Sequence, residues 1–99
     1  MLPGGAARPE ALPLVLSLVS VEAPNLLVVE ARPVRRGSGI IALLREVDGT
    51  PLTIRADAVS VHVPVQRVDE VNVVEDTLRE GVDALSFRPF EAKFVRLNL

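Results

Sequence analysis

The sequence predicts an all-β fold, a two-layer antiparallel β-sandwich of about seven or eight strands. Apolar residues recur at every second position through most of the chain, which is the period of a half-buried strand. Turn signals separate these runs at intervals of roughly eight to twelve residues. The one stretch of helical or turn character, 75–81 (EDTLREG), is too short to form a stable helix alone.

The chain has 99 residues, which is enough for one domain with its own core. Residues 1–11 are rich in Gly, Pro and Ala and show no period, so we expect a linker or a disordered arm there. We assign residues 12–99 to the β-sandwich. The apolar run 12–21 is too short to span a bilayer, and its internal serines favour a half-buried strand over a signal peptide.

The strands follow one another with recognisable breaks. We expect them at 14–22, 26–34, 40–47, 52–63, once or twice within 65–74, at 84–88 and at 90–97. Asp48-Gly49 gives the strongest hairpin signal, because Gly accepts a positive φ. The period-two pattern changes phase at Val59, which predicts a bulge or a strand break near Ala58. Pro89 marks a hinge between the last two strands.

The composition argues against several classes of function and excludes any chemistry that needs cysteine. Hydrophobic residues make up 48% of the chain and aromatic residues only 3%, with no Trp or Tyr, so the core is aliphatic. The scarcity of aromatic rings and the net charge of −2 argue against a stand-alone sugar binder and against nucleic-acid binding. Because there is no cysteine, disulfides and thiolate metal sites are excluded, and a reducing compartment such as the cytoplasm fits the sequence.

Few residues carry the chemistry of an active site. His62 is the single histidine, and because a zinc site needs several ligands we expect it to be an exposed strand residue. No serine at positions 17, 20, 38, 60 and 86 lies in the glycine pattern of a nucleophile elbow, so we expect none of them to be a nucleophile. The segment RRGSG (35–39) offers backbone donors for a phosphate, but no helix follows it, so we favour a hairpin loop.

Four carboxylates lie close together in sequence: Asp69, Glu70, Glu75 and Asp76. Two of them could serve as the acid and the nucleophile of a glycosidase. The alternative, which we favour, is a solvated strand edge followed by a turn. We therefore predict no catalytic, cofactor-binding or metal-binding residue in this chain.

All three phenylalanines fall in the final segment, LSFRPFEAKFVRLNL (85–99). We expect the three rings, Phe87, Phe90 and Phe94, to be largely buried. Their expected neighbours include the aliphatic residues Leu85, Ile40 and Val28.

The alternation slips after Phe94, so that Val95 and Leu97 fall on the face of Glu91. We expect an apolar outer face there, shared with the first strand (Val15, Val19 or Val21) and covered by another domain or a second copy.

Three stretches resemble the C-terminal domain of glycoside hydrolase family 38 proteins, the retaining α-mannosidases. The end, 85–99, resembles that domain's closing Pro-Phe-Glu and apolar-polar alternation. NLLVVEARPVRRGSGIIALLRE (25–46) is similar to its Asn, Val-rich strand, Ala-Lys-Pro, acidic-glycine loop and strand ending Arg-Leu-Tyr-Glu. VNVVED (71–76) is similar to its Asn-Leu-Leu-Glu, with Asn72 and Glu75 matching.

The resemblance implies an accessory domain of a mannosidase. The family's zinc ligands and Asp nucleophile belong to a large N-terminal domain that these 99 residues do not contain, so zinc is expected there and no cofactor in this chain. The partner implied is that catalytic domain, with self-association as the alternative, and neither nucleic acid nor membrane. Leu43 and Arg45 replace the family's Arg and Tyr, while Glu46 is kept. An autonomous β-sandwich module that binds protein or glycan is the second interpretation.

Overall fold

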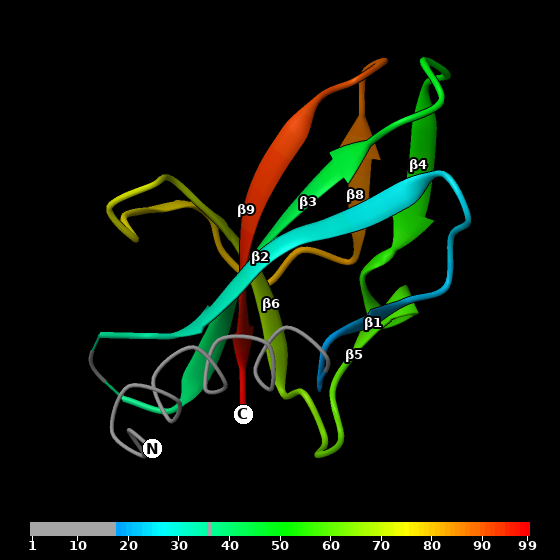
Figure 1. Cartoon of the computed structure of the whole chain (residues 1–99). Helices are drawn as coiled ribbons and strands as arrows, with labels where there is room; N and C mark the ends of the chain where they lie inside the picture. The colour runs from blue at the N-terminus through cyan, green and yellow to red at the C-terminus, as the bar shows by residue number, and fades with distance from the viewer. Residues whose placement is uncertain (1–17, 36) are drawn as a thin grey trace, which may run out of the picture.

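The computed structural model describes residues 18–35 and 37–99, and these form the all-β fold that the sequence predicts. Figure 1 shows the strands β1 (Ser20–Val21), β2 (Leu26–Pro33), β3 (Gly39–Glu46), β4 (Leu52–Arg55), β5 (Val59–Ser60), β6 (Arg67–Val71), β7 (Thr77–Arg79), β8 (Ala84–Phe87) and β9 (Ala92–Asn98). A 3₁₀ turn, η1 (Ala56–Ala58), joins β4 to β5. No helix in this described part of the chain is long and apolar enough to cross a membrane.

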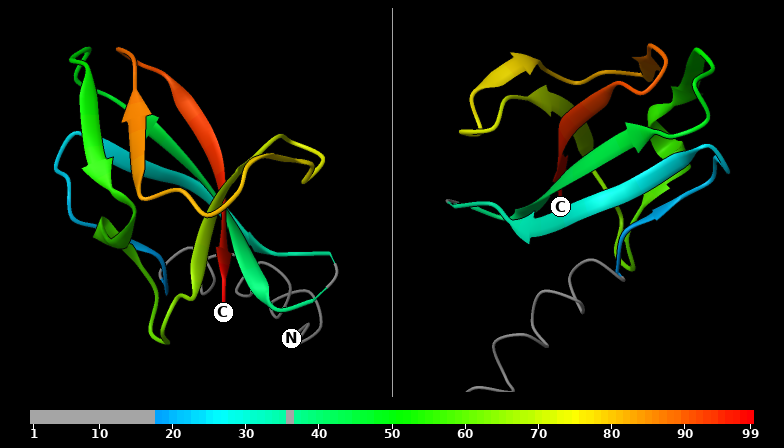
Figure 2. Two further views of the ribbon diagram at one scale, coloured as in Figure 1. Left: turned by 180° about the vertical axis from the view of Figure 1, so that it is seen from behind. Right: turned by 45° about the horizontal axis from the view of Figure 1, so that its top comes forward.

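The strands form two layers, and every pair is antiparallel. One layer is a five-stranded sheet in the order β2-β3-β9-β6-β7. The other consists of two short pairs, β4-β8 and β1-β5, which follow each other because β4 continues through η1 into β5. Figures 1 and 2 show the short pairs facing the large sheet, so the predicted two-layer sandwich is confirmed.

The core between the layers is aliphatic, as the composition predicts. The large sheet contributes Ile40, Ala42, Leu44, Val68, Val95 and Leu97, and the short pairs contribute Ile54, Val59, Leu85 and Phe87. Phe87 is the one aromatic ring among these buried side chains, and its expected burial is confirmed.

The break expected near Ala58 is confirmed. After β4 the chain enters η1, and this turn resets the alternation so that Ile54 and Val59 both face the core. The first strand is shorter than expected, because β1 covers only Ser20–Val21 among the described residues. Positions 14–17 of the expected strand, and the arm expected at 1–11, lie outside the described residues.

Asp48-Gly49 makes a turn, but the predicted hairpin is wrong. β3 pairs with β2 and β9, whereas β4 pairs with β8, so the chain crosses here from one layer to the other. Pro89 lies at a second crossing, from β8 to β9, which agrees with the expected hinge. The expectation for 75–81 is also wrong in part, because Thr77–Arg79 forms β7 and pairs with β6.

The predicted outer apolar face of Val95 and Leu97 is wrong. Both side chains are fully buried in the chain's own core, together with Val19 of the first segment. The reason is the position of β9, which lies between β3 and β6 and directs these residues toward the short pairs. Phe94 and Arg96 alternate with them and lie on the opposite face of the sheet.

That opposite face is covered within the chain itself. Ile41 and Val71 are 1% and 3% exposed but lie outside the main core cluster. Arg32 of β2 forms an ion pair with Glu75 of the β6–β7 loop, and Arg96 donates to the Glu75 carbonyl oxygen at 3.3 Å. The loop is thereby held across the sheet, which accounts for the burial of apolar residues such as Ile41 on the outer face of β3.

Candidate functional site

Two turns meet at one end of the sandwich around the carboxylate of Glu46, the last residue of β3. Its side chain is fully buried. Oε1 accepts hydrogen bonds from the backbone N–H groups of Gly49 (2.7 Å), Thr50 (3.1 Å) and Phe90 (2.9 Å). Oε2 accepts from the Asp48 N–H (2.9 Å) and from the Asn25 side-chain amide (3.2 Å).

We call these five donors and the carboxylate the Glu46 cluster. Burial opposes ionisation of Glu46, but the hydrogen bonds from Phe90, Asp48, Asn25 and Gly49 outweigh it and lower the pKa of Glu46 from 4.5 to about 2. The group is therefore a charged structural acceptor near neutral pH. It has no proton to donate there and no free lone pair directed at solvent, so it does not act as a catalytic acid or base.

The Pro-Phe-Glu segment forms a tight turn against this cluster. Glu91 N–H donates to the Arg88 carbonyl oxygen at 3.0 Å, and Arg88 N–H donates to the Glu91 carboxylate at 2.8 Å. Pro89 at the second position and a φ of 62° for Phe90 at the third are features of a type II turn, whose third position usually holds Gly. Phe90 therefore adopts a backbone conformation that is rare for a bulky residue.

The predicted burial of Phe90 is wrong, because 55% of this residue is exposed. The left-handed backbone directs its ring outward onto the neighbouring turn. A Cβ atom added at Gly49, which has a φ of 77°, would lie 2.8 Å from the tip of this ring, so the contact requires glycine. Phe94 also departs from the expectation, since it is only half-buried on the other face of the sheet.

A shallow groove of about 520 Å³ runs beside the Pro-Phe-Glu turn, between β4, β8 and β9. The hydroxyls of Thr53 and Ser86 lie 3.0 Å apart on its exposed wall. Lys93 lies 5.9 Å from the centre of the Phe87 ring and 3.1 Å from Glu70. Lys93 is thus occupied by a carboxylate and a ring, and it does not activate either hydroxyl as a nucleophile.

Two of the four carboxylates in the acidic cluster are buried rather than on a solvated edge, whereas Glu75 and Asp76 lie in the loop after β6, where a turn was predicted. Asp69 is 0% exposed and Glu70 6%, so that part of the expectation is wrong. They are consecutive residues of β6 and point to opposite faces of the sheet. Two carboxylates on opposite faces do not flank one glycosidic bond, which excludes them as an acid and nucleophile pair.

Asp69 lies at the centre of a polar network on the outer face. It accepts hydrogen bonds from the Gly81 N–H at 2.8 Å, from Asn98 at 3.0 Å and from Arg96 at 3.0 Å, and it pairs with Arg67 at 3.1 Å. Burial opposes the charge, but these partners together lower the pKa of Asp69. The network fixes β6, β9 and the segment after β7 to one another.

Glu75 closes the β6–β7 loop. The hydrogen bond from Arg32, followed by that from the Arg35 N–H, lowers the pKa of Glu75. Asn72 holds the same loop, because its Oδ1 accepts from the N–H groups of Val74 (3.1 Å) and Asp76 (2.9 Å).

His62 is exposed, as predicted, but it lies in a bend after β5 rather than in a strand. Within residues 18–35 and 37–99, no three His, Cys, Asp or Glu side chains gather into a group that could hold a metal ion. β2 and β3 pair as antiparallel neighbours up to Pro33 and Ile40, which agrees with the hairpin predicted for the RRGSG segment. Ser17 lies outside the described residues. Ser86 lines the groove beside β8, whereas Ser60 and His62 line another groove, around the β5–β6 loop.

We compared the chain with family models, with curated proteins and with solved structures. None matches it.

Sequence reasoning missed the Glu46 cluster, although a signal for it is present. A single glutamate ends the apolar run GIIALLRE immediately before a turn. A carboxylate there can satisfy the backbone N–H groups that the turn leaves free. The contacts with Asn25 and Phe90 have no such local signal, because they join positions 21 and 44 residues apart.

Proposed function

We propose that this chain is the C-terminal, non-catalytic β-sandwich domain of a family 38 α-mannosidase-like glycoside hydrolase, which supports or borders the catalytic domain during mannoside hydrolysis. The Glu46 cluster is the observation that carries this proposal. Asn25, Glu46 and the Pro-Phe-Glu turn come from the stretches that resemble the family, and they meet in one hydrogen-bonded unit. If the resemblance were only one of composition, there would be no reason for the polar residues that match the family to contact one another.

The third resembling stretch supports the proposal in the same way. Its matching residues are Asn72, which organises the β6–β7 loop, and Glu75, which pairs with Arg32. Arg32 is the cation of Ala31-Arg32-Pro33, where the family has Ala-Lys-Pro. An acidic residue in one stretch thus meets a basic residue in another.

The proposal places the chemistry outside this chain. The described residues offer no set of zinc ligands, so they do not fit the metal of the family's reaction. Zinc and the Asp nucleophile belong, in this proposal, to a preceding catalytic domain of the parent enzyme. A cytoplasmic location is part of the proposal and accords with the absence of cysteine from the sequence.

An autonomous β-sandwich module that binds protein or glycan is the second candidate. The exposure of Phe90 favours it, because a single projecting aromatic side chain is a common anchor of recognition surfaces.

The two candidates separate in one experiment on the coding region. A continuous reading frame upstream of Met1 that encodes His-x-Asp metal ligands supports the accessory domain, and its absence supports the module. If the frame exists, the longer chain should hydrolyse an aryl α-mannoside, while the purified 99-residue chain should not. Turnover by the 99-residue chain that survives repurification would overturn the proposal.

A further inference from the structure

The strand β8 has a hydrogen-bonded neighbour on one side only, because it pairs with β4 and with no other described strand. The Ala56 N–H donates to the Asp83 carbonyl oxygen at 2.8 Å, which fixes the alternation along this antiparallel pair. The backbone groups of Ala84 and Ser86 therefore point away from β4, and no hydrogen bond between described residues uses them. Figures 1 and 2 show the β6–β7 hairpin bending away from β8, so it does not cover this edge.

An open strand edge can pair with another chain, and both edges of the large sheet carry features that hinder such pairing. β2 has a register shift between Val28 and Glu30, carries Arg32 and ends at Pro33. β7 is only three residues long and also has a register shift against its neighbour. The four residues of β8, ALSF, include no charge and no proline, and their register against β4 is unbroken. Of these three edges, β8 is the one without such protection.

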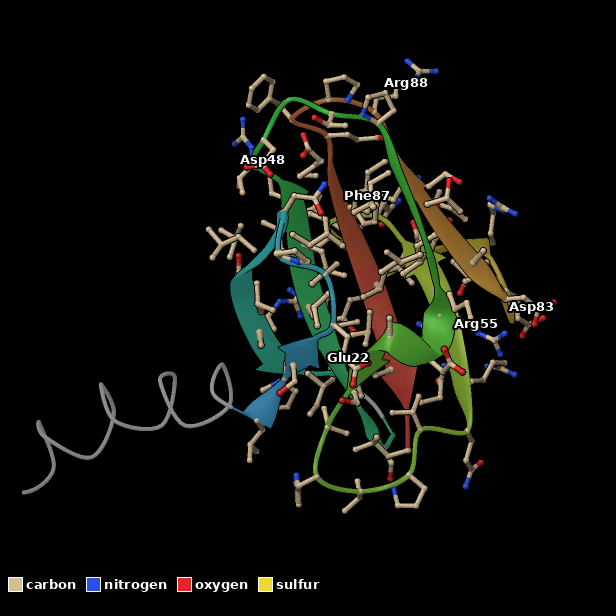
Figure 3. The ribbon with its side chains drawn as sticks, turned by 90° about the vertical axis from the view of Figure 1, so that its right-hand side faces the viewer. Glu22, Asp48, Arg55, Asp83, Phe87 and Arg88 are labelled. Carbon is tan, nitrogen blue, oxygen red and sulfur yellow. The ribbon has the colours of Figure 1, made fainter. Side chains whose placement is uncertain are left out.

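The two ends of β8 carry opposite charges. Asp83 precedes the strand and Arg88 follows it, both are exposed, and Figure 3 shows them at opposite ends of β8. Neither forms an ion pair with another described residue, and Arg55, which lines the same shallow groove as Asp83, pairs with Asp57 at 3.2 Å. Because an antiparallel neighbour runs in the opposite direction, a second copy of β8 would bring each of these free charges to its opposite.

We propose that the β8 edges of two copies of this chain pair antiparallel about a two-fold axis, so that their layers of short strand pairs join into one sheet. In this pairing Ala84 of each copy lies opposite Ser86 of the other, and the two residues exchange their backbone hydrogen bonds. Leu85 lies on the axis, and Asp83 of each copy lies next to Arg88 of the other.

The hydrogen bonds within the chain select this register. A shift of the pairing by two residues in one direction would need the N–H of Val82, which donates to the Val68 carbonyl oxygen at 2.8 Å. A shift in the other direction would need the N–H of Arg88, which donates to the Glu91 carboxylate at 2.8 Å. The proposed register uses only the backbone groups that are free.

The contact uses the same surface on both copies, so association stops at the dimer. Two short strands make a small interface, and the association is therefore weak, with a dissociation constant on the order of 100 μM. This inference does not depend on the proposed function.

Two charge variants test the pairing. In sedimentation velocity from about 10 μM to about 1 mM, the parent chain should pass from monomer to dimer and form nothing larger. Asp83→Arg and Arg88→Asp each place like charges at the contact, so each variant alone should dimerise at least about tenfold more weakly than the parent. Mixed in equal amounts they should form a heterodimer, because every contact then joins opposite charges.

A backbone variant tests the strand pairing itself. Ser86→Pro removes an N–H that the pairing needs, at an edge position where proline is compatible with a strand, so it should abolish the dimer. Ser86→Ala is the matched control, since it keeps that N–H and should leave dimerisation unchanged. Circular dichroism establishes that both variants are folded. Hydrogen exchange on the parent gives a second measurement, because the amides of Ala84 and Ser86 should become protected as concentration rises.

Several outcomes would overturn the proposal. A parent chain that is still monomeric at about 1 mM would exclude the contact, and assemblies larger than a dimer would exclude its two-fold symmetry. Association that survives in folded Ser86→Pro, charge variants that do not combine, or a dimer in which the amides of Ala84 and Ser86 exchange as fast as in the monomer would show that β8 is not the interface.

Discussion

The carboxylate of Glu46 accepts a hydrogen bond from the backbone N–H of Phe90, at 2.9 Å and across 44 residues of sequence. Through the same carboxylate, the turn at Asp48-Gly49 is fixed to the turn at Pro89. These are two of the places where the chain passes between the layers. One buried charge therefore fixes how β4 and β9 leave their turns.

Glu46→Gln should lower the melting temperature by on the order of 10 °C, because an amide N–H₂ group replaces one acceptor oxygen in a shell made of donors. Glu22→Gln is the matched control, since Glu22 is exposed. It should melt within about two degrees of the parent. Calorimetry on both variants checks the prediction, and equal melting temperatures for the two would contradict it.

The depressed pKa of Glu46 predicts how stability depends on pH. An unfolded chain binds a proton near pH 4.5, whereas the folded chain resists protonation until about pH 2. The stabilisation from Glu46 is therefore complete above pH 4.5 and is lost as the pH falls toward 2. Urea unfolding between these values should show the stability gap between the parent and Glu46→Gln shrinking as the pH falls.

Asp69 and Glu75 also have lowered pKa values, so both proteins should lose stability in acid. The difference between parent and variant isolates Glu46, because the other two groups are present in each. A gap that stays constant down to about pH 2 would show that Glu46 is not the titrating group.

Phe87 and Phe90 should differ sharply in their contribution to stability. Phe87 is 3% exposed, and Phe87→Ala should cost roughly 3–5 kcal/mol. Phe90→Gly should change stability by no more than about 1 kcal/mol, because glycine relieves the left-handed backbone while the exposed ring is lost. Denaturant unfolding of the two variants checks this, and a loss above about 3 kcal/mol for Phe90→Gly would show that its ring is part of the core.

The contrast between Phe87 and Phe90 shows what sequence pattern does and does not determine. Period-two alternation predicts the strands, and it places Phe87 correctly because that residue lies inside a strand. Phe90 lies in a turn, where burial depends on φ and on a carboxylate 44 residues away. The prediction that Val95 and Leu97 form an outer face is wrong for a related reason, because alternation does not show which face of a central strand meets the second layer.

The residues of the candidate site also stand out in the sequence, but their contacts with distant residues cannot be read from it. The four carboxylates of the acidic cluster stand out in sequence, but whether they share a face depends on strand direction and on pairing with Arg32 and Arg96. The alternation within β6 already separates Asp69 from Glu70. Arg96 lies 27 residues from Asp69 and Arg32 lies 43 residues from Glu75, so no local pattern identifies these two partners. Arg67, two residues from Asp69, is the partner that lies close in sequence.

Gly49→Ala should be more destabilising than Gly37→Ala. Both glycines have a positive φ, 77° and 87°, so each substitution incurs a backbone cost of about 1 kcal/mol. At Gly37 an added methyl group has no atom within 4 Å, whereas at Gly49 it lies 2.8 Å from the Phe90 ring. In a Phe90→Ala background the excess at Gly49 should disappear, and an excess that persists would place the conflict elsewhere.

Asp69→Asn should be among the most destabilising single changes on the outer face. It removes the charge that Arg96 and Arg67 face, and because Asp69 is fully buried the loss should be about 3 kcal/mol. Asp57→Asn is the matched control, since Asp57 pairs with Arg55 at 3.2 Å on the surface, where both side chains are more than 70% exposed. That change should cost less than about 1 kcal/mol. Denaturant unfolding at neutral pH checks the pair, and similar losses for the two variants would mean that the buried network contributes no more than a surface ion pair.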